Sequence, residues 1–208
     1  NQKIAPNNLP PMKLIQTEEE IILNGNGFDI KFDKKKGMLS SIVFNDKELI
    51  QEGLKPNFWR SPTDNDLGNN MPVRCGRWKN ASNKLQTKKI NIKEVSPQQI
   101  EIEVTSEIEE VNSEYFTKYT ILGNSEIIVS SRIITHDSTL SELPRFGMSM
   151  ILPKSFDKIA WFGRGPHESY QDRKTGAPIG LYEGNVWEQY FPYVRPQENG
   201  NKTDVRWL

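Results

Sequence analysis

Apolar and polar residues alternate with a period of two through much of this chain, and this pattern limits its fold more than any other feature. Three rows show the alternation clearly, in residues 28–33, 100–105 and 115–121. Successive side chains of a β-strand point to opposite faces, so these rows predict strands with one buried and one exposed face, typical of antiparallel sheets. Residues 127–129 and 133–134 are apolar at consecutive positions, which predicts a strand covered on both faces.

Turn-forming residues separate these rows at regular intervals. Clusters of Asn, Asp, Gly, Pro and Ser occur at residues 24–27, 36–37, 45–46, 96–97 and 123–125. Such residues tolerate the tight or left-handed backbone of hairpin turns. The strands between them are about eight to ten residues long, a spacing that favours a β-sandwich over βαβ units. We therefore predict an all-β fold, a large antiparallel β-sandwich.

Evidence for helices is weak. Residues 74–85 are compatible with one short helix, although Gly76 weakens it. Pro166 suits the first position of a helix and predicts a helical turn over residues 166–170. A doubly wound α/β fold requires several amphipathic helices of ten or more residues, and the sequence offers none.

Charge and composition exclude several classes of protein. The chain has 208 residues, with 27 basic and 27 acidic side chains, so its formal net charge is zero. This balance argues against general affinity for nucleic acid or for anionic membranes. The mean hydropathy of −0.67 and the lack of a long apolar run argue against a membrane-spanning segment. With one cysteine, Cys75, and two histidines, neither an internal disulfide nor a structural zinc site is expected.

The two ends of the sequence suggest a piece of a longer protein. Residues 1–11, with three prolines and three asparagines, predict an interdomain linker, which leaves residues 12–208 as the folded region. Residues 205–208 have the character of a strand with no turn after it, so we expect the sandwich to be truncated at its C-terminus. Unpaired sheet edges invite pairing with a second copy, and we therefore predict a homo-oligomer.

Two loop-rich stretches interrupt the β pattern, at residues 56–70 and 163–196, and they concentrate Trp, Arg, Asp, Gly and Pro. Loops of this composition on a rigid scaffold commonly line a cleft or an interface. Within residues 64–68, DNDLG, oxygen-bearing side chains alternate as in a calcium loop, but the twelfth position is Cys75 where that loop requires glutamate. No metal site is therefore predicted, and the remaining interpretations are an Asx-rich turn or a loop that faces a sugar or an interface.

The second stretch opens with residues 163–170, GRGPHESY. It begins like a dinucleotide-binding fingerprint but lacks the third glycine, so nucleotide binding is rejected. His167 beside Glu168 suggests acid–base chemistry. The alternative interpretation is a loop network without catalytic function, formed by Arg164, Glu168, Tyr170, Asp172 and Arg173.

No catalytic constellation is identified in the chain. A nucleophile elbow and a zinc-protease motif are both missing, and no spacing singles out a pair of glycosidase carboxylates among the acidic residues. We therefore nominate no catalytic residue. The candidates for a surface that faces a cleft, a substrate or another domain are Trp59, Arg60, Asp64, Asp66, Arg164, His167, Glu168 and Tyr170.

Three long motifs carry a family resemblance. Residues 56–68, PNFWRSPTDNDLG, residues 161–173, WFGRGPHESYQDR, and residues 190–200, YFPYVRPQENG, occur in that order. Together they resemble the C-terminal small-chain domain of the large bacterial β-galactosidases of glycoside hydrolase family 2. The resemblance runs from about Gly27 to the last residue, with Ser61 as a minor departure where alanine is expected.

The resemblance implies a galactose mutarotase-like supersandwich from a parent enzyme that hydrolyses terminal β-D-galactosides, such as lactose, with retention. In that family the catalytic glutamates and a magnesium ion belong to a preceding barrel domain, so this chain alone is expected to be inactive and to hold no cofactor. The barrel domain and the galactoside substrate are the implied partners. The alternative is a stand-alone carbohydrate-binding module or an aldose 1-epimerase, for which His167 is the one acid–base group we nominate. The sequence does not distinguish a cytoplasmic from a periplasmic location.

Overall fold

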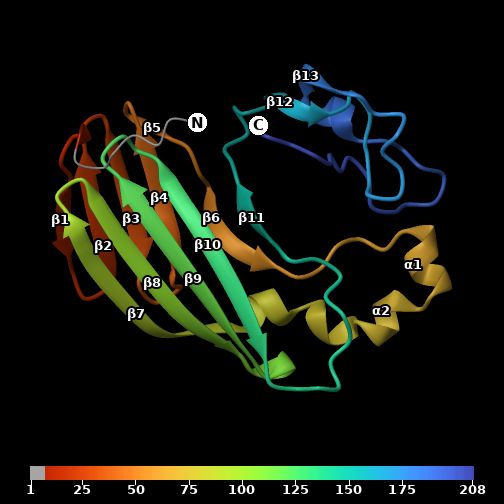
Figure 1. The fold of residues 1–208 in the computed structure, drawn as a ribbon, viewed down its shortest axis with the longest axis horizontal. Helices are drawn as coiled ribbons and strands as arrows, with labels where there is room; N and C mark the ends of the chain where they lie inside the picture. Colours follow the sequence, from red (N-terminus) through yellow and green to blue (C-terminus); the bar gives the residue numbers. More distant parts are fainter. Residues whose placement is uncertain (1–7) are drawn as a thin grey trace. The chain divides into compact units, whose positions relative to one another are not determined.

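The computed structural model describes residues 8–208, which form two compact units (Figure 1). Unit 1 contains the described part of Asn1–Trp59 together with Cys75–Pro153, and unit 2 contains Arg60–Arg74 and Lys154–Leu208. The predicted linker over residues 1–11 lies largely outside the described residues, so its boundary at residue 12 stays a prediction. Each unit is described by itself below.

Unit 1 contains two large antiparallel sheets. The first has the order β1-β2-β3-β4-β5 and the second the order β10-β9-β8-β7. The strands of the first sheet are β1 (Lys13–Gln16), β2 (Glu20–Gly25), β3 (Phe28–Asp33), β4 (Met38–Phe44) and β5 (Lys47–Glu48). The strands of the second sheet are β7 (Leu85–Ser96), β8 (Gln99–Ile108), β9 (Ser113–Leu122) and β10 (Ile127–Thr135). A third, two-stranded sheet pairs β6 (Glu52–Asn57) with β11 (Gly147–Ile151).

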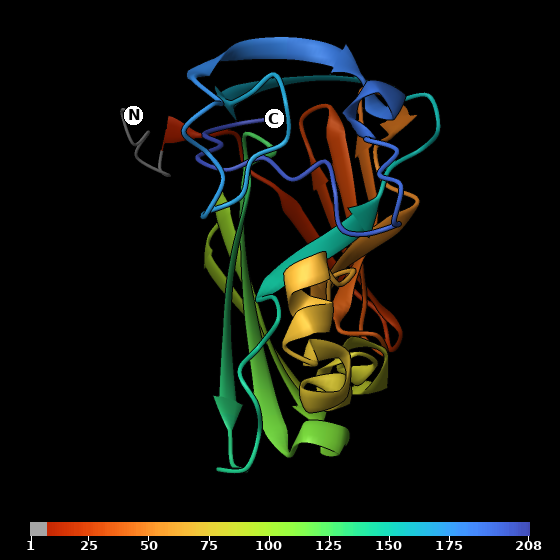
Figure 2. The same cartoon turned by 90° about the vertical axis from the view of Figure 1, so that its right-hand side faces the viewer.

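The two large sheets pack face to face, and Figure 2 shows them as separate layers of red-orange and yellow-green strands. Phe32 of β3 and Tyr119 of β9 meet edge to face, with ring centroids 5.4 Å apart. The inward-facing residues of both sheets form one continuous core, as the alternation in the sequence predicts. The all-β class and the antiparallel sandwich are therefore confirmed.

The predicted turns also occur, and their backbone explains their composition. Asn45 and Asp46 join β4 to β5 with φ angles of 47° and 62°, the left-handed region that these two residue types tolerate. Gly37 has a φ of 66°, and a Cβ there would lie 2.6 Å from the Thr87 hydroxyl oxygen. The local sequence therefore determines the hairpin register of this unit.

An aromatic cluster extends the interior of unit 1. The Phe58 ring packs edge to face on Trp78 and on Tyr115, at 5.7 and 5.6 Å between centroids. Cys75 is fully buried beside these short helical segments and makes no disulfide. The helix expected within residues 74–85 is in fact two short segments, η2 (Gly76–Trp78) and η3 (Ala81–Lys84), whereas α2 (Met71–Arg74) belongs to unit 2 and ends at residue 74.

Three expectations about secondary structure were wrong. Strand β10 is not covered on both faces, because Ile128 and Ile134 are 47% and 36% exposed. Residues 166–170 contain no helical turn, because the chain is held there by contacts to residues 200–203. The loop-rich stretches also contain three regular elements that we missed, α1 (Asp64–Gly68), β13 (Ile179–Asn185) and η5 (Val186–Gln189).

Unit 2 is built on a two-stranded antiparallel sheet of β12 (Lys158–Arg164) and β13, with the segment 203–207 alongside β12. Backbone hydrogen bonds of 2.7 and 3.0 Å join Phe162 to Arg206 and to Trp207. Gly163 permits this approach, since a Cβ there would lie 2.8 Å from the Cα of Val205. The short helical segment η5 (Val186–Gln189) also belongs to unit 2, whereas η4 (Glu109–Val111) belongs to unit 1. Among the helices of residues 8–208, none has the length and hydropathy of a membrane span.

Candidate functional site

The first motif forms a capped helical turn in unit 2. Thr63 caps α1, and the backbone N–H groups of Thr63 and Asp66 each donate to the other residue's side chain, at 2.8 and 3.3 Å. This reciprocal arrangement is a capping box, and its signal in the sequence is the T-x-x-D of residues 63–66. The local sequence thus contains the signal for α1, although we interpreted residues 64–68 as a turn or loop.

The same helix holds a half-buried ion pair. Arg60 binds Asp66 with both terminal nitrogens, and one of these distances, Nη2 to Oδ1, is 2.9 Å. Burial by itself raises the pKa of Asp66, but the hydrogen bonds from Arg60 and Thr63 outweigh it and hold this pKa below its ordinary value of 3.8. Asp66 is therefore a charged anchor for this loop.

Asp64, at the start of α1, connects the first motif to the third. Its carboxylate lies 3.5 Å from the guanidinium of Arg195, and its backbone N–H donates to the Gln197 side chain at 3.4 Å. Both members of the ion pair are largely exposed, so the pair is expected to add little stability. It nevertheless places residues 64 and 195 side by side, although they are far apart in the sequence.

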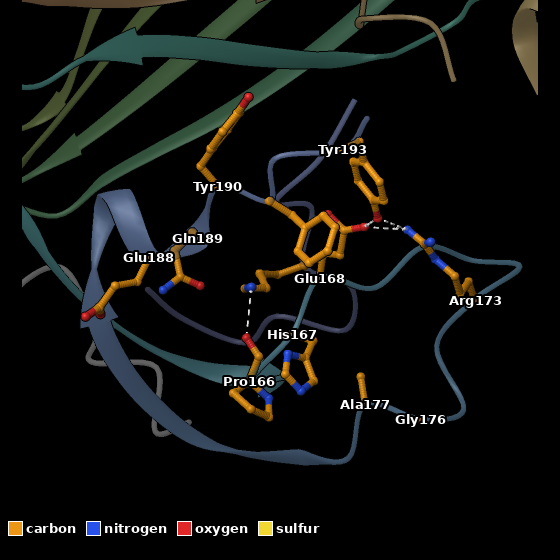
Figure 3. A pocket seen from close by; sticks show the side chains of 12 residues that line it. Pro166, His167, Glu168, Arg173, Gly176, Ala177, Glu188, Gln189, Tyr190 and Tyr193 are labelled. Carbon is orange, nitrogen blue, oxygen red and sulfur yellow. Dashed lines mark hydrogen bonds and ion pairs between the residues drawn. The ribbon is translucent and has the colours of Figure 1, made fainter. Parts of the chain in front are cut away.

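Glu168 connects the second motif to the third, and Figure 3 shows its carboxylate between Arg173 and Tyr193. It accepts hydrogen bonds from Arg173 at 2.5 Å, from the Tyr193 hydroxyl, and from the backbone N–H of Gly200 at 2.8 Å. The side chain of Glu168 is only 12% exposed, so its charge requires these partners. We refer to this arrangement as the Glu168 junction, formed by Glu168, Arg173, Tyr193 and Gly200.

Buried hydroxyl groups extend the junction. The backbone N–H of Ser169 donates to the carbonyl of Asn201 at 2.7 Å, and the hydroxyls of Ser169 and Thr203 are 2.9 Å apart. Both hydroxyl side chains are buried, and their mutual hydrogen bond offsets the cost of removing them from water. Residues 200–203 are therefore fixed against the second motif.

Arg164 forms a separate cluster rather than part of the junction. Its Nε binds Asp204 at 2.5 Å, and its Nη1 donates to the carbonyls of Lys174 and Ala177 at 3.0 and 2.9 Å. The single network suggested for Arg164, Glu168, Tyr170, Asp172 and Arg173 is thus divided, and Asp172 is exposed. The reason is tertiary, because Asp204 lies on a distant segment that runs beside β12.

The remaining candidates lie in different environments. Trp59 belongs to unit 1, where it is half-buried and its backbone N–H donates to Asn57 at 3.1 Å. The Tyr170 hydroxyl is buried and makes no hydrogen bond within the described residues, and burial raises the pKa of Tyr170 to about 12. His167 is exposed. The structure therefore brings seven of the eight candidates into unit 2 and leaves Trp59 in unit 1.

A hollow of about 370 Å³ lies beside the Glu168 junction. Its lining comes from two parts of unit 2, residues 166–177 and residues 188–202, and includes His167 and Glu168. Our nominations missed Arg173, Tyr193, Phe191 and Lys202. The first three stand within the quoted motifs, where they would have been found, whereas nothing in the sequence around Lys202 marks it.

The ion pairs Arg60–Asp66, Arg164–Asp204 and Glu168–Arg173 join segments of unit 2, so the arrangement is suited to holding loops. Within residues 8–208, His, Cys, Asp and Glu side chains form no group of three or more that would hold a metal ion.

Comparison with known proteins identifies the family. The pattern of the family described as "Beta galactosidase small chain" matches residues 24–208. The β-galactosidase of Priestia megaterium is 41% identical over 95% of this chain, and those of Halalkalibacterium halodurans and Lactobacillus delbrueckii subsp. bulgaricus are 33% and 32% identical over 94% and 93% of it. In each case the chain spans about 19% of the relative's length. The predicted resemblance is confirmed, and this chain belongs to the β-galactosidase small-chain family.

Proposed function

We propose that this chain is the non-catalytic part of a β-galactosidase that hydrolyses terminal β-D-galactosides, such as lactose, with retention. The observation that carries the proposal is that residues 60–68 of the first motif meet the second and third motifs within unit 2, through Asp64–Arg195 and through Glu168–Tyr193. Motifs that are distant in sequence and joined by polar contacts indicate a shaped surface rather than a hydrophobic core.

The lowered pKa values of three carboxylates suit these groups to holding structure rather than to donating a proton. A glycosidase acid needs a raised pKa so that it can donate a proton near neutral pH. Here hydrogen bonds from Thr139 and Arg77 lower the pKa of Asp137 to about 2, and the hydrogen bond from Arg164 lowers the pKa of Asp204. Asp66 is shifted in the same direction. These groups are suited to permanent charge and to holding structure.

In the proposed division of labour, the catalytic barrel of the parent protein supplies the glutamates and the magnesium ion, and this chain supports it. The candidate residues for the barrel-facing or substrate-facing surface stay those nominated from the sequence, Trp59, Arg60, Asp64, Asp66, Arg164, His167, Glu168 and Tyr170. Their contribution would be to hold loops in a productive geometry rather than to react. Self-association of the chain also stays a prediction.

A chimera tests this proposal directly. The matching segment of the Priestia megaterium β-galactosidase is replaced by this chain, and hydrolysis of a chromogenic β-galactoside is compared with that of the isolated chain and of the Priestia megaterium enzyme lacking the segment. We expect the chimera to be active and the other two proteins to be inactive. Cleavage by the isolated chain at a rate near that of the chimera would show that the chain is itself catalytic.

A further inference from the structure

We propose that the hollow beside the Glu168 junction is a binding site for a single neutral pyranose ring, a saccharide subsite carried by this chain itself. The inference rests on the proposed function for the choice of saccharides as ligands, and it adds a site within these residues. Its volume of about 370 Å³ is within the range of small-molecule pockets.

The hollow has one aromatic wall. Phe191 is 55% exposed, and its ring lies 4.6 Å from that of Tyr193, at an angle of 56°. The hydroxyl of Tyr193 is held by Glu168, so the pair of rings is fixed against the junction. A fixed and half-exposed aromatic ring offers an apolar face to the C–H surface of a sugar at little cost in conformational entropy.

The lining also contains polar groups. Lys202 donates to the Pro166 carbonyl at 3.1 Å, as drawn in Figure 3, and an ammonium carries three N–H donors. His167 is exposed, also lines the hollow and adds a group that donates or accepts. Sugar hydroxyls both donate and accept, so groups of both kinds are required around the ring.

The charges in the hollow favour a neutral ligand. Glu168 is paired with Arg173, and one oxygen of Glu188 accepts the backbone N–H of Asn185 at 2.7 Å. An anion would meet the carboxylates of Glu168 and Glu188, and a cation would meet Arg173 and Lys202. A polyhydroxylated neutral ring avoids both repulsions and keeps its hydrogen bonds.

Two of the residues that line the hollow, Gly176 and Ala177, are small. Apart from Gly176 and its two chain neighbours, no residue has an atom within 4 Å of the position that a Cβ on Gly176 would take, and Ala177 beside it is buried. Small residues at these positions leave room for a ring to approach the backbone, which larger side chains would fill.

The test is a titration of the 208-residue chain, labelled with ¹⁵N, with methyl β-D-galactopyranoside, followed by amide chemical shifts. We expect saturable shifts confined to residues 166–177 and 188–202, with a dissociation constant on the order of 1–10 mM. Inorganic phosphate is titrated in parallel as the anionic probe. Shifts that saturate with phosphate but not with the galactoside, or no saturable shifts with either, would overturn the inference.

Three variants sharpen the titration. Phe191→Ala should weaken galactoside binding about tenfold, whereas the control Trp187→Ala, which changes an 83% exposed ring outside the lining, should change it less than about twofold. Gly176→Leu adds bulk where the structure has space, so it should abolish binding with the fold intact. If Gly176→Leu folds and binds as tightly as the parent chain, the site lies elsewhere and the inference is wrong.

The chimera separates this inference from the proposed function. An active chimera with no galactoside binding by the isolated chain would leave the proposed function standing and remove the subsite. The opposite outcome is an inactive chimera together with galactoside binding by the isolated chain that Gly176→Leu abolishes. It would support the subsite and contradict the supporting role in a β-galactosidase.

Discussion

Different kinds of interaction stabilise the interiors of the two units. Unit 1 encloses a continuous apolar core in which Ile21, Leu23 and Ile102 are completely buried. In unit 2, Trp161 and Met71 are buried apolar side chains, while Ser169 and Thr203 are buried polar groups that depend on hydrogen bonds. Apolar burial is non-directional, whereas hydrogen bonds and ion pairs require particular distances and angles.

This difference explains why the candidate site lies in unit 2. Polar groups removed from water are stable only with their partners in place, so the network that satisfies them also fixes the positions of the loops. A hydrophobic core supplies more free energy but specifies loop geometry less closely. We therefore expect substitutions in unit 1 to lower global stability and those in unit 2 to act mainly on local order.

The largest effect is expected in the core of unit 1. Phe32→Ala removes a fully buried ring that packs on Tyr119, and it should lower the free energy of unfolding by about 3–5 kcal/mol. Urea denaturation followed by far-ultraviolet circular dichroism measures this. The matched control is Lys31→Ala on the same strand, which is exposed and should change stability by about 0.5 kcal/mol or less. Equal effects of the two substitutions would contradict the placement of this core.

The next effect concerns the Glu168 junction. Glu168→Gln removes the charge that binds Arg173, Tyr193 and the Gly200 amide, so we expect a loss of about 2 kcal/mol and faster hydrogen exchange at Gly200. The control is Glu183→Gln, at an exposed position of β13. If amide exchange at Gly200 is unchanged, the junction does not order the third motif.

A smaller effect is expected at the cap of α1. Thr63→Ala removes the hydroxyl that accepts the Asp66 amide and should lower the free energy of unfolding by about 1 kcal/mol. Thr63→Ser retains the hydroxyl and should keep most of the parent chain's free energy of unfolding. Thermal denaturation of the two variants checks this, and an equally low melting temperature for both would exclude the capping role.

The smallest effect is a dependence on pH. Because the pKa of Asp66 is lowered on folding, its contribution to stability is complete above its unfolded value, near pH 4, and is lost as the pH falls through the lowered pKa. In Asp66→Asn the loss of stability between pH 7 and pH 2 should therefore be smaller than in the parent chain, by ~1 kcal/mol or less. Urea midpoints measured across this range show which protein loses more stability on acidification. A steeper loss in Asp66→Asn than in the parent chain would contradict the prediction.

The predictability of each element follows from the range of the interactions that form it. Buried and more exposed residues alternate strictly in strands β3, β8 and β9. The sequence pattern predicted these strands because each residue's hydropathy indicates which face of the sheet it lies on. Strand β13 was missed because Gly180 and Gly184 stand at its inward positions and remove the apolar signal. The helical turn expected at Pro166 was wrong because Lys202 and Asn201 hold residues 166–169 from a distance in the sequence.

The sequence by itself determined the all-β class, the hairpin turns and the family, since periodicity, turn residues and motifs are local properties of the chain. Only the tertiary structure decided that Asp64 meets Arg195, that Glu168 meets Tyr193, and that Lys202 reaches Pro166. The physical reason is that a polar side chain accepts any suitable partner within reach. Which partner it finds depends on how distant segments pack, and no local pattern records that.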